Sequence, residues 1–223
     1  DPSGTGVFLR GVDRETDPFA VAQRSGFAAV LPPGGTAIPH ATNPPVGGFP
    51  PPVFSPITVP VGFVIADLDV RIDIEHPRAS DLIVSLLPPG VAPIVGNLGQ
   101  AVVLTNRNPR DAAGNFLPID ANDTSLRNYT ETVFDDEAIT DITDYPEATT
   151  PFSGRYLPED DLGVFDGTLS NAAGGTWHLV IQDARPGPYE PREDPENDPL
   201  IPLSASLVAW SLDMAKGITM TTE

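Results

Sequence analysis

The sequence predicts an all-β sandwich, and three observations support this prediction. Apolar residues alternate with mostly charged ones over residues 64–75, a period of two that is typical of a half-buried strand in an antiparallel sheet. Further short apolar blocks follow, separated by turn residues such as Pro88-Pro89-Gly90 and Gly174-Gly175. No segment shows a convincing apolar period of 3.6 residues. The chain is therefore expected to pack strands rather than helices.

Residues 1–56 are expected to form a proline-rich N-terminal arm. Residues 31–60 contain ten prolines, a composition typical of extended chain that runs along a surface. Short strands are candidates at residues 7–9 and 27–31. Four phenylalanines on a free tail would leave apolar surface in water, so we expect the arm to pack on its own sandwich or on a neighbouring subunit. They are Phe8, Phe27, Phe49 and Phe54.

The sandwich itself is expected over residues 57–214, with a C-terminal tail at 215–223. A second proline- and acid-rich segment, residues 184–202, joins two strands that a short hairpin could connect, and loops of this length are usually functional or mobile. The predicted strands are residues 64–75, 82–87, 101–105, 131–134, 164–169, 176–182 and 203–213.

Two tryptophans at alternating positions are assigned to the core. Trp177 lies on the apolar face of its strand, and Trp210 is expected to share one face with Val208, Leu212 and Met214. Large aromatic side chains at such positions are more often buried than used to stack on a ligand.

The charge balance argues against a nucleic-acid partner. The chain has 31 Asp and Glu residues against 12 Lys and Arg residues, a formal net charge of -19, whereas phosphate binding needs a basic surface. The same acidity suits calcium, whose ligands are carboxylate and carbonyl oxygens; general solvation is the other explanation for any single acidic residue. With no cysteine, disulfides and thiolate ligands are excluded. No apolar run approaches the ~18 residues of a membrane span.

Several blocks occur in an order that is similar to a known family. They are His76-Pro77, Asp81-Leu82, Phe134-Asp135-Asp136-Glu137-Ala138, Pro158 with Leu162, Phe165 and Gly167, Gly175-Thr176-Trp177 with Leu179 and Asp183, and finally Leu207, Trp210 and Leu212. Together they resemble the P-domain, also called the P/Homo B domain, of kexin- and furin-like proprotein convertases and of bacterial secreted proteins.

This resemblance covers about residues 57–214 and implies a jelly-roll β-sandwich of about eight strands. It also implies an accessory role, in which the domain packs beside a subtilisin-like catalytic domain, stabilises it and tunes its calcium and pH dependence. The chain departs from the family in two places. The 184–202 insert replaces the usual short turn of the last hairpin, and the proline-rich residues 1–56 lie outside the family pattern.

No nucleophile–base pair is recognisable in the sequence, so we expect no peptidase, glycosidase or esterase activity. A serine protease needs a nucleophile, a base and an orienting acid in one site. The three histidines, His40, His76 and His178, do not lie near a nucleophile motif, and their spacing does not support a zinc site. His76 closes a strand before a proline and is interpreted as a structural turn residue.

Carboxylate clusters are the better candidates for a binding site. The predicted calcium ligands are Asp73, Asp81, Asp135, Asp136 and Asp183, because these acids lie at or near strand ends and by similarity to bacterial P-domains that hold calcium. A second set forms a row on the face of one strand that should be exposed. For this row a solvated surface and a cation-bridged subunit contact are the alternatives. It consists of Asp67, Asp69, Asp73 and Glu75.

Two functions remain open from the sequence. The first is a non-catalytic, calcium-stabilised module, extracellular or at the cell surface, that supports an exported protease or a larger secreted protein. The alternative is a self-assembling subunit of an extracellular filament, surface layer or shell, with the arm adding a strand to an identical subunit. Carbohydrate binding is less favoured because aromatic residues make up only 7% of the chain. Asn122 and Asn128 match the N-glycosylation pattern, which matters only in a secretory host.

Overall fold

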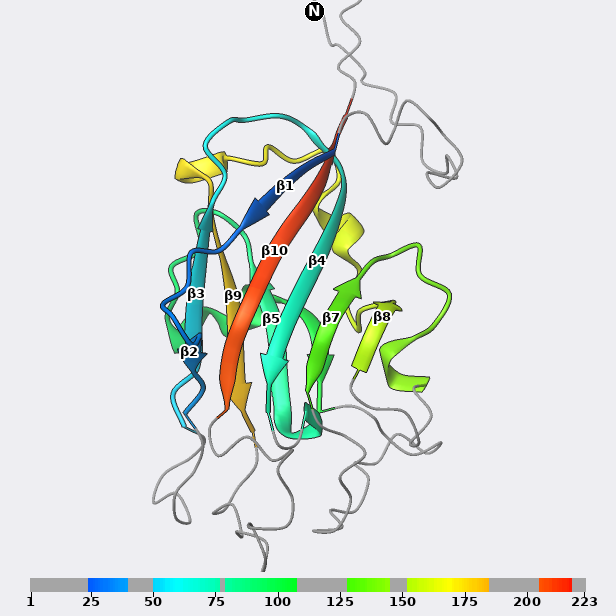
Figure 1. Cartoon of the computed structure of the whole chain (residues 1–223). Helices are drawn as coiled ribbons and strands as arrows, with labels where there is room; N and C mark the ends of the chain where they lie inside the picture. The colour runs from blue at the N-terminus through cyan, green and yellow to red at the C-terminus, as the bar shows by residue number, and fades with distance from the viewer. Residues whose placement is uncertain are drawn as a thin grey trace, which may run out of the picture.

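The computed structural model describes residues 24–39, 50–76, 79–107, 128–144, 152–184 and 205–217. Within these ranges the chain forms strands and short 3-10 helices, and no α-helix, which confirms the predicted all-β sandwich. Figure 1 labels most of the strands. They are β1 (Arg24–Ala28), β2 (Thr36–Ala37), β3 (Val53–Thr58), β4 (Ile65–Glu75), β5 (Leu82–Leu87), β6 (Val102–Asn106), β7 (Tyr129–Phe134), β8 (Phe152–Tyr156), β9 (Thr176–Asp183) and β10 (Ser206–Lys216).

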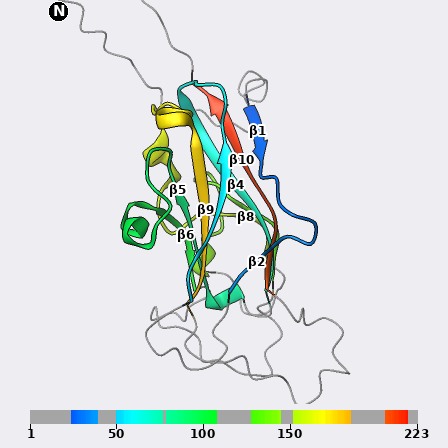
Figure 2. The ribbon, with the colours of Figure 1, turned by 90° about the vertical axis from the view of Figure 1, so that its left-hand side faces the viewer.

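Two sheets face each other, as the side view in Figure 2 shows. One has the order β1-β10-β4-β7-β8, with β2 also paired to β10, and the other has the order β3-β9-β5-β6. When β1 is counted as the first strand, the set β1-β10-β4-β7 opposite β3-β9-β5-β6 is the eight-stranded order of a jelly roll. The strand β8 is an addition that pairs in parallel with β7.

The part of the predicted arm that the structure describes belongs to the sandwich. The strand β1 pairs antiparallel with β10, placing Phe27 opposite Leu212, and β3 pairs antiparallel with β9. The boundary expected between residues 56 and 57 therefore falls inside β3. Pro56 is tolerated there because β3 is an edge strand, where a missing N–H need not break the ladder. The candidate strand at 7–9, with Phe8 and Phe49, lies outside the described residues.

The core lies between the two sheets and contains both tryptophans, as predicted. Trp177 is 1% exposed and Trp210 is 2% exposed. Each indole N–H finds an acceptor: Trp177 Nε1 donates to Ser170 O at 2.9 Å, and Trp210 Nε1 donates to Ser55 Oγ at 2.9 Å. Full burial of a large apolar side chain contributes about 1.5–3 kcal/mol, so an N–H without an acceptor would cancel much of that gain.

The prediction of a strand at residues 164–169 is wrong. The chain forms a 3-10 helix at Leu162–Phe165, and Leu169 makes only an isolated bridge with Val64. The Asp161 side chain accepts the N–H of Gly163 and so caps this helix. Its two buried residues, Leu162 and Phe165, are three apart, the spacing that a 3-10 helix places on one side.

The strand β10 contains a bulge that overturns one core assignment. Its register against β4 shifts between Leu207 and Ala209, which leaves Val208 as the extra residue. Val208 is 40% exposed, whereas Leu212 and Met214 are buried as expected. A bulge inserts one extra residue into the alternating pattern of a strand. Leu207 before it and Trp210 after it therefore both face the core, while the extra residue, Val208, faces outward.

Two further segments bear on the predictions. The strand β8 was not predicted, because its burial does not alternate: its first and last residues are buried and the three between them are exposed.

Most of the 184–202 insert lies outside the described residues, which resume at Ala205. No helix among the described residues is long and apolar enough to cross a membrane.

Candidate functional site

The outer face of β4 carries a network of ion pairs around two buried aspartates, where a solvated row of acids was expected. Asp67 and Asp69 are only 5% and 3% exposed, so the prediction of an exposed face is wrong for these two residues. The strand β4 is central in its sheet, two strands from β1 on one side and two from β8 on the other. An arginine from each of these outer strands covers the two aspartates.

Arg24 of β1 reaches across β10. It is in register with Ala215, which is in register with Asp67, so the small side chain between them leaves room for the guanidinium. The gap of about two strand spacings, roughly 10 Å, is spanned by the arginine and the aspartate side chain together. Arg24 Nη2 lies 3.0 Å from Asp67 Oδ2 and also binds Asp69 Oδ2, while Nε lies 3.3 Å from Asp213 Oδ1.

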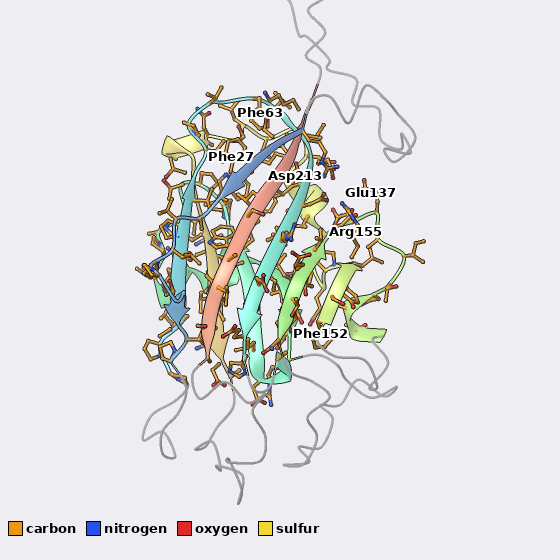
Figure 3. The ribbon with its side chains drawn as sticks, viewed as in Figure 1. Phe27, Phe63, Glu137, Phe152, Arg155 and Asp213 are labelled. Carbon is orange, nitrogen blue, oxygen red and sulfur yellow. The ribbon has the colours of Figure 1, made fainter. Side chains whose placement is uncertain are left out.

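Arg155 of β8 approaches the same carboxylate from the other side. Its Nη2 lies 3.3 Å from Asp69 Oδ2, and its Nη1 binds Asp135 Oδ2 at the end of β7. Figure 3 shows Arg155 and Asp213 over this end of the sheet, on opposite sides of β4. The network therefore ties four strands of one sheet together through side chains.

The network holds more negative than positive charge. Four aspartates and two arginines give 2 - 4 = -2 when all are ionised. Burial raises the pKa of Asp69 to about 7, and the neighbouring carboxylates of Asp67 and Asp135 add to this, although Arg24 and Arg155 oppose it. One carboxylate of the network therefore takes up a proton near neutral pH.

Asp135 behaves in the opposite way. Burial acts to raise its pKa, but hydrogen bonds from Arg155 and from Glu137 outweigh that effect and lower it. The backbone N–H of Glu137 donates to Asp135 Oδ1 at 2.9 Å. Asp135 is thus held as the ionised partner of Arg155 and is already committed to a structural ion pair.

Asp136 forms a carboxyl pair with Asp161. Asp136 Oδ1 accepts from Leu162 N at 3.0 Å, and Asp161 Oδ1 accepts from Gly163 N at 2.8 Å. Burial raises the pKa of Asp136 to about 7, and its hydrogen bond to Asp161 adds to the rise. A Cβ at Gly163 would lie 2.7 Å from Asp161 Oδ1, so a larger residue there would make the Asp161 carboxylate shift.

Asp81 and Asp183 meet at the opposite end of β4, beside His76. Both are nearly fully buried, at 1% and 2% exposed, and His76 is 0% exposed. His76 Nε2 lies 3.7 Å from Asp183 Oδ2, and Ala184 N donates to Asp81 O at 2.8 Å. His76 N donates to Asn128 Oδ1 at 2.8 Å, which fits its predicted role as a turn residue.

Asp73 lies apart from the other predicted calcium ligands. It is half-buried on the outer face of β4. Burial raises its pKa, while a backbone hydrogen bond from Glu131 acts to lower it and the Glu131 charge acts to raise it. The neighbouring cation on this face, Arg71, pairs with Glu131 at 2.7 Å. Glu75, the last member of the predicted row, is exposed.

The structure therefore distributes the five predicted calcium ligands over separate places. Asp81 and Asp183 lie together, Asp135 and Asp136 are neighbours in sequence but bind different partners, and Asp73 is isolated. Calcium takes six to eight oxygen ligands. Among the described residues no three His, Cys, Asp or Glu side chains are grouped as a metal's ligands. The five residues do not fit a single ion in this arrangement, and calcium binding stays a prediction.

Two of the three histidines lie in the described part of the chain. His76 is buried. His178 is half-buried on β9, in register with Pro56 of β3 and Leu87 of β5, and burial lowers its pKa. His40 lies outside the described residues.

Comparisons with known proteins leave the family open. No family model matches the chain, and no curated protein matches it. A chain in the crystal structure of the Aeromonas sobria serine protease with a chaperone is 15% identical over 88% of this chain, with a TM-score of 0.44. A chain in the crystal structure of the Aeromonas sobria serine protease is 16% identical over 87% of this chain, with a TM-score of 0.39. The match spans 26% of each of those chains. Values this low do not establish a shared function.

Proposed function

We propose that this chain is a non-catalytic β-sandwich module of an exported protein, which acts by packing against a protein partner in the manner of a P-domain. The partner expected from the P-domain resemblance is a subtilisin-like catalytic domain, and the expected location is extracellular or at the cell surface. The jelly-roll strand order is compatible with this proposal, although fold alone does not select a function.

The observation that carries the proposal is how the charged side chains are used. Asp67, Asp69 and Asp135 are bound to arginines from other strands of the same sheet, and His76 is buried. A catalytic acid or base must reach a substrate. Groups committed to holding the sheet together support a structural module better than an enzyme.

The proposal includes calcium binding, for which the neighbouring carboxyl groups of Asp136 and Asp161 are the candidate ligands. Both carboxylates lie at the start of one 3-10 helix, and the raised pKa of Asp136 reflects burial and the second carboxyl beside it. A divalent cation would relieve that repulsion. The described residues supply only these two carboxylates there, so any calcium would need water or further oxygens to complete its shell.

The alternative, a self-assembling subunit whose arm adds a strand to its neighbour, is less favoured because part of the arm already pairs within its own chain. An arm that adds a strand to a neighbour must leave its own sheet, yet β1 pairs over five residues with β10 of its own chain. Phe27 also stacks on Phe63 of the same chain, with ring centroids 6.4 Å apart. These contacts favour a self-contained sandwich.

Native mass in solution tests the proposal. The full chain should sediment as a monomer over a wide range of concentrations, with and without a chelator. Polymers that form reproducibly at neutral pH would overturn the accessory module and favour the assembly subunit. A monomer that hydrolyses a peptide, ester or glycoside, and loses that activity when His178 is replaced, would overturn the non-catalytic role.

A further inference from the structure

The bulge in β10 leaves a short stretch of that strand's edge between two partners. The strand β2 pairs with Ser206 and Leu207, whereas pairing with β1 begins at Ser211. Ala29 N donates to Trp210 O at 3.0 Å and closes the gap on that side. The exposed bulge residues between these contacts, Val208 and Ala209, form the floor of a groove.

The connection between β1 and β2 forms the wall of this groove. It turns tightly, with Gly35 N donating to Pro32 O at 2.9 Å. Gly35 packs directly on the bulge, since a Cβ there would lie 2.4 Å from Leu207 O. The side chains of Ala29 and Leu31 in this wall are apolar, while backbone atoms and Glu75 make much of the groove surface polar. The volume of about 410 Å³ is within the roughly 300–1,000 Å³ of ligand sites.

The side of the groove facing β4 is acidic. Among the described residues, Glu75 is the only charged one that lines it, and Glu75 is exposed. Asp73, the preceding outward-facing residue of β4, is in register with Ala209. The cation on this face of β4, Arg71, is paired with Glu131 at 2.7 Å. The charge complementary to this side is therefore positive.

We propose that this groove binds an extended segment of a protein partner that presents an apolar side chain next to a lysine or arginine. The apolar side chain would lie on Val208 and Leu31, the basic group would face Glu75, and the edge of β10 would offer backbone groups, as in recognition by strand edges. This inference deepens the proposed function and rests on it, because it names the surface on which a partner would dock.

Blocked tetrapeptides test the groove on the full chain. We would titrate Ac-Ser-Leu-Arg-Ser-NH2, Ac-Ser-Leu-Glu-Ser-NH2 and Ac-Ser-Ser-Arg-Ser-NH2 and follow backbone amide shifts by NMR. The Leu-Arg peptide should shift the amides of Gly35, Val208 and Ala209 and bind more tightly than either of the others. Glu75→Gln should weaken it about two- to fivefold, the range of an exposed ion pair.

Two variants with similar exposed apolar residues separate the groove from the rest of the surface. Val208→Asp should abolish the shifts, whereas Val61→Asp, at a residue 64% exposed and remote from the groove lining, should leave them unchanged. Retention of the native amide spectrum shows that each variant folds. Shifts located elsewhere, equal binding of the Leu-Glu peptide, or no binding by the Leu-Arg peptide would overturn the inference.

The outcome also separates this inference from the proposed function. If the chain is monomeric and binds none of the peptides, the proposed module function still stands, but the groove is not the site where its partner docks. A chain that polymerises, with polymerisation lost in Val208→Asp, would show that a second copy occupies the groove and would contradict both.

Discussion

Arg24 is the residue on which the buried charges of β4 most depend. Replacing it by Met leaves Asp67 and Asp69 covered but with one guanidinium fewer, and we expect the free energy of unfolding to fall by about 2–4 kcal/mol, near the cost of breaking a buried ion pair. Chemical denaturation at pH 7.5 measures this change in the free energy of unfolding. The control is Arg71→Met, whose pair with Glu131 is half exposed or more and should contribute about 0–1 kcal/mol. Equal losses would contradict the network's structural role.

The carboxyl pair of Asp136 and Asp161 gives a second prediction for single residues. Asp136→Asn removes a charge that the folded state accommodates poorly, so the variant should be more stable than the parent at pH 8, by on the order of 1 kcal/mol after screening by solvent. The gain should vanish near pH 5, where the parent carries the proton. Asp160→Asn, at an exposed acid next to Asp161, is the control. A variant that is less stable at pH 8 would contradict the prediction.

The strand β1 carries the prediction at the scale of elements. Deleting residues 1–39 removes β1 and β2 and uncovers the edge of β10, so the unfolding temperature should fall while the mass stays that of one chain. A deletion of residues 1–23, which ends just before β1, separates the loss of the strand from the loss of the chain ahead of it. A deletion of 1–39 that keeps the parent's unfolding temperature would show that β1 adds nothing to the fold.

The pH dependence of stability belongs to the whole molecule. Asp69 and Asp136 have folded-state pKa values of about 7, above their ordinary value of 3.8. Between these values the folded chain binds more protons than the unfolded chain, so stability should fall as the pH rises from about 4 to above 7. We expect a higher unfolding temperature at pH 5.5 than at pH 8. Below pH 4 protonation of Asp135 would weaken its pair with Arg155. Equal temperatures at pH 5.5 and 8 would contradict this.

Calcium gives the last prediction for the whole molecule. At pH 8 millimolar calcium should raise the unfolding temperature above its value in chelator, because a ligand at 100 times its dissociation constant adds about 2.7 kcal/mol to the folded state. The effect should shrink at pH 5.5, where protons compete, and should be lost in Asp136→Asn. Identical unfolding temperatures in calcium and chelator at pH 8 would remove calcium from the proposed function.

Local sequence patterns are enough to predict the sandwich and most of its core. The period of two in residues 64–75 identified β4 within one residue, and alternation identified Trp177 and Trp210 as buried. These features are local: a strand that is half buried must alternate whatever it pairs with, and a large apolar side chain is stable mainly inside. The turn chemistry of prolines and glycines similarly separated β5, β6, β9 and β10.

Contacts between strands that are distant in the sequence set which acidic residues are buried and where the groove lies. Asp67 and Asp69 looked solvated because alternation reports only which face a side chain is on, and their cover comes from Arg24 and Arg155, far away in the sequence. The chain's few cations were the one available signal, but nothing local says which acid each will meet. Val208 is exposed instead of lying in the core because a bulge shifts the register of β10, and this bulge depends on how β10 pairs with β4. Pairing between distant strands set both outcomes, and a sequence pattern records only one strand at a time.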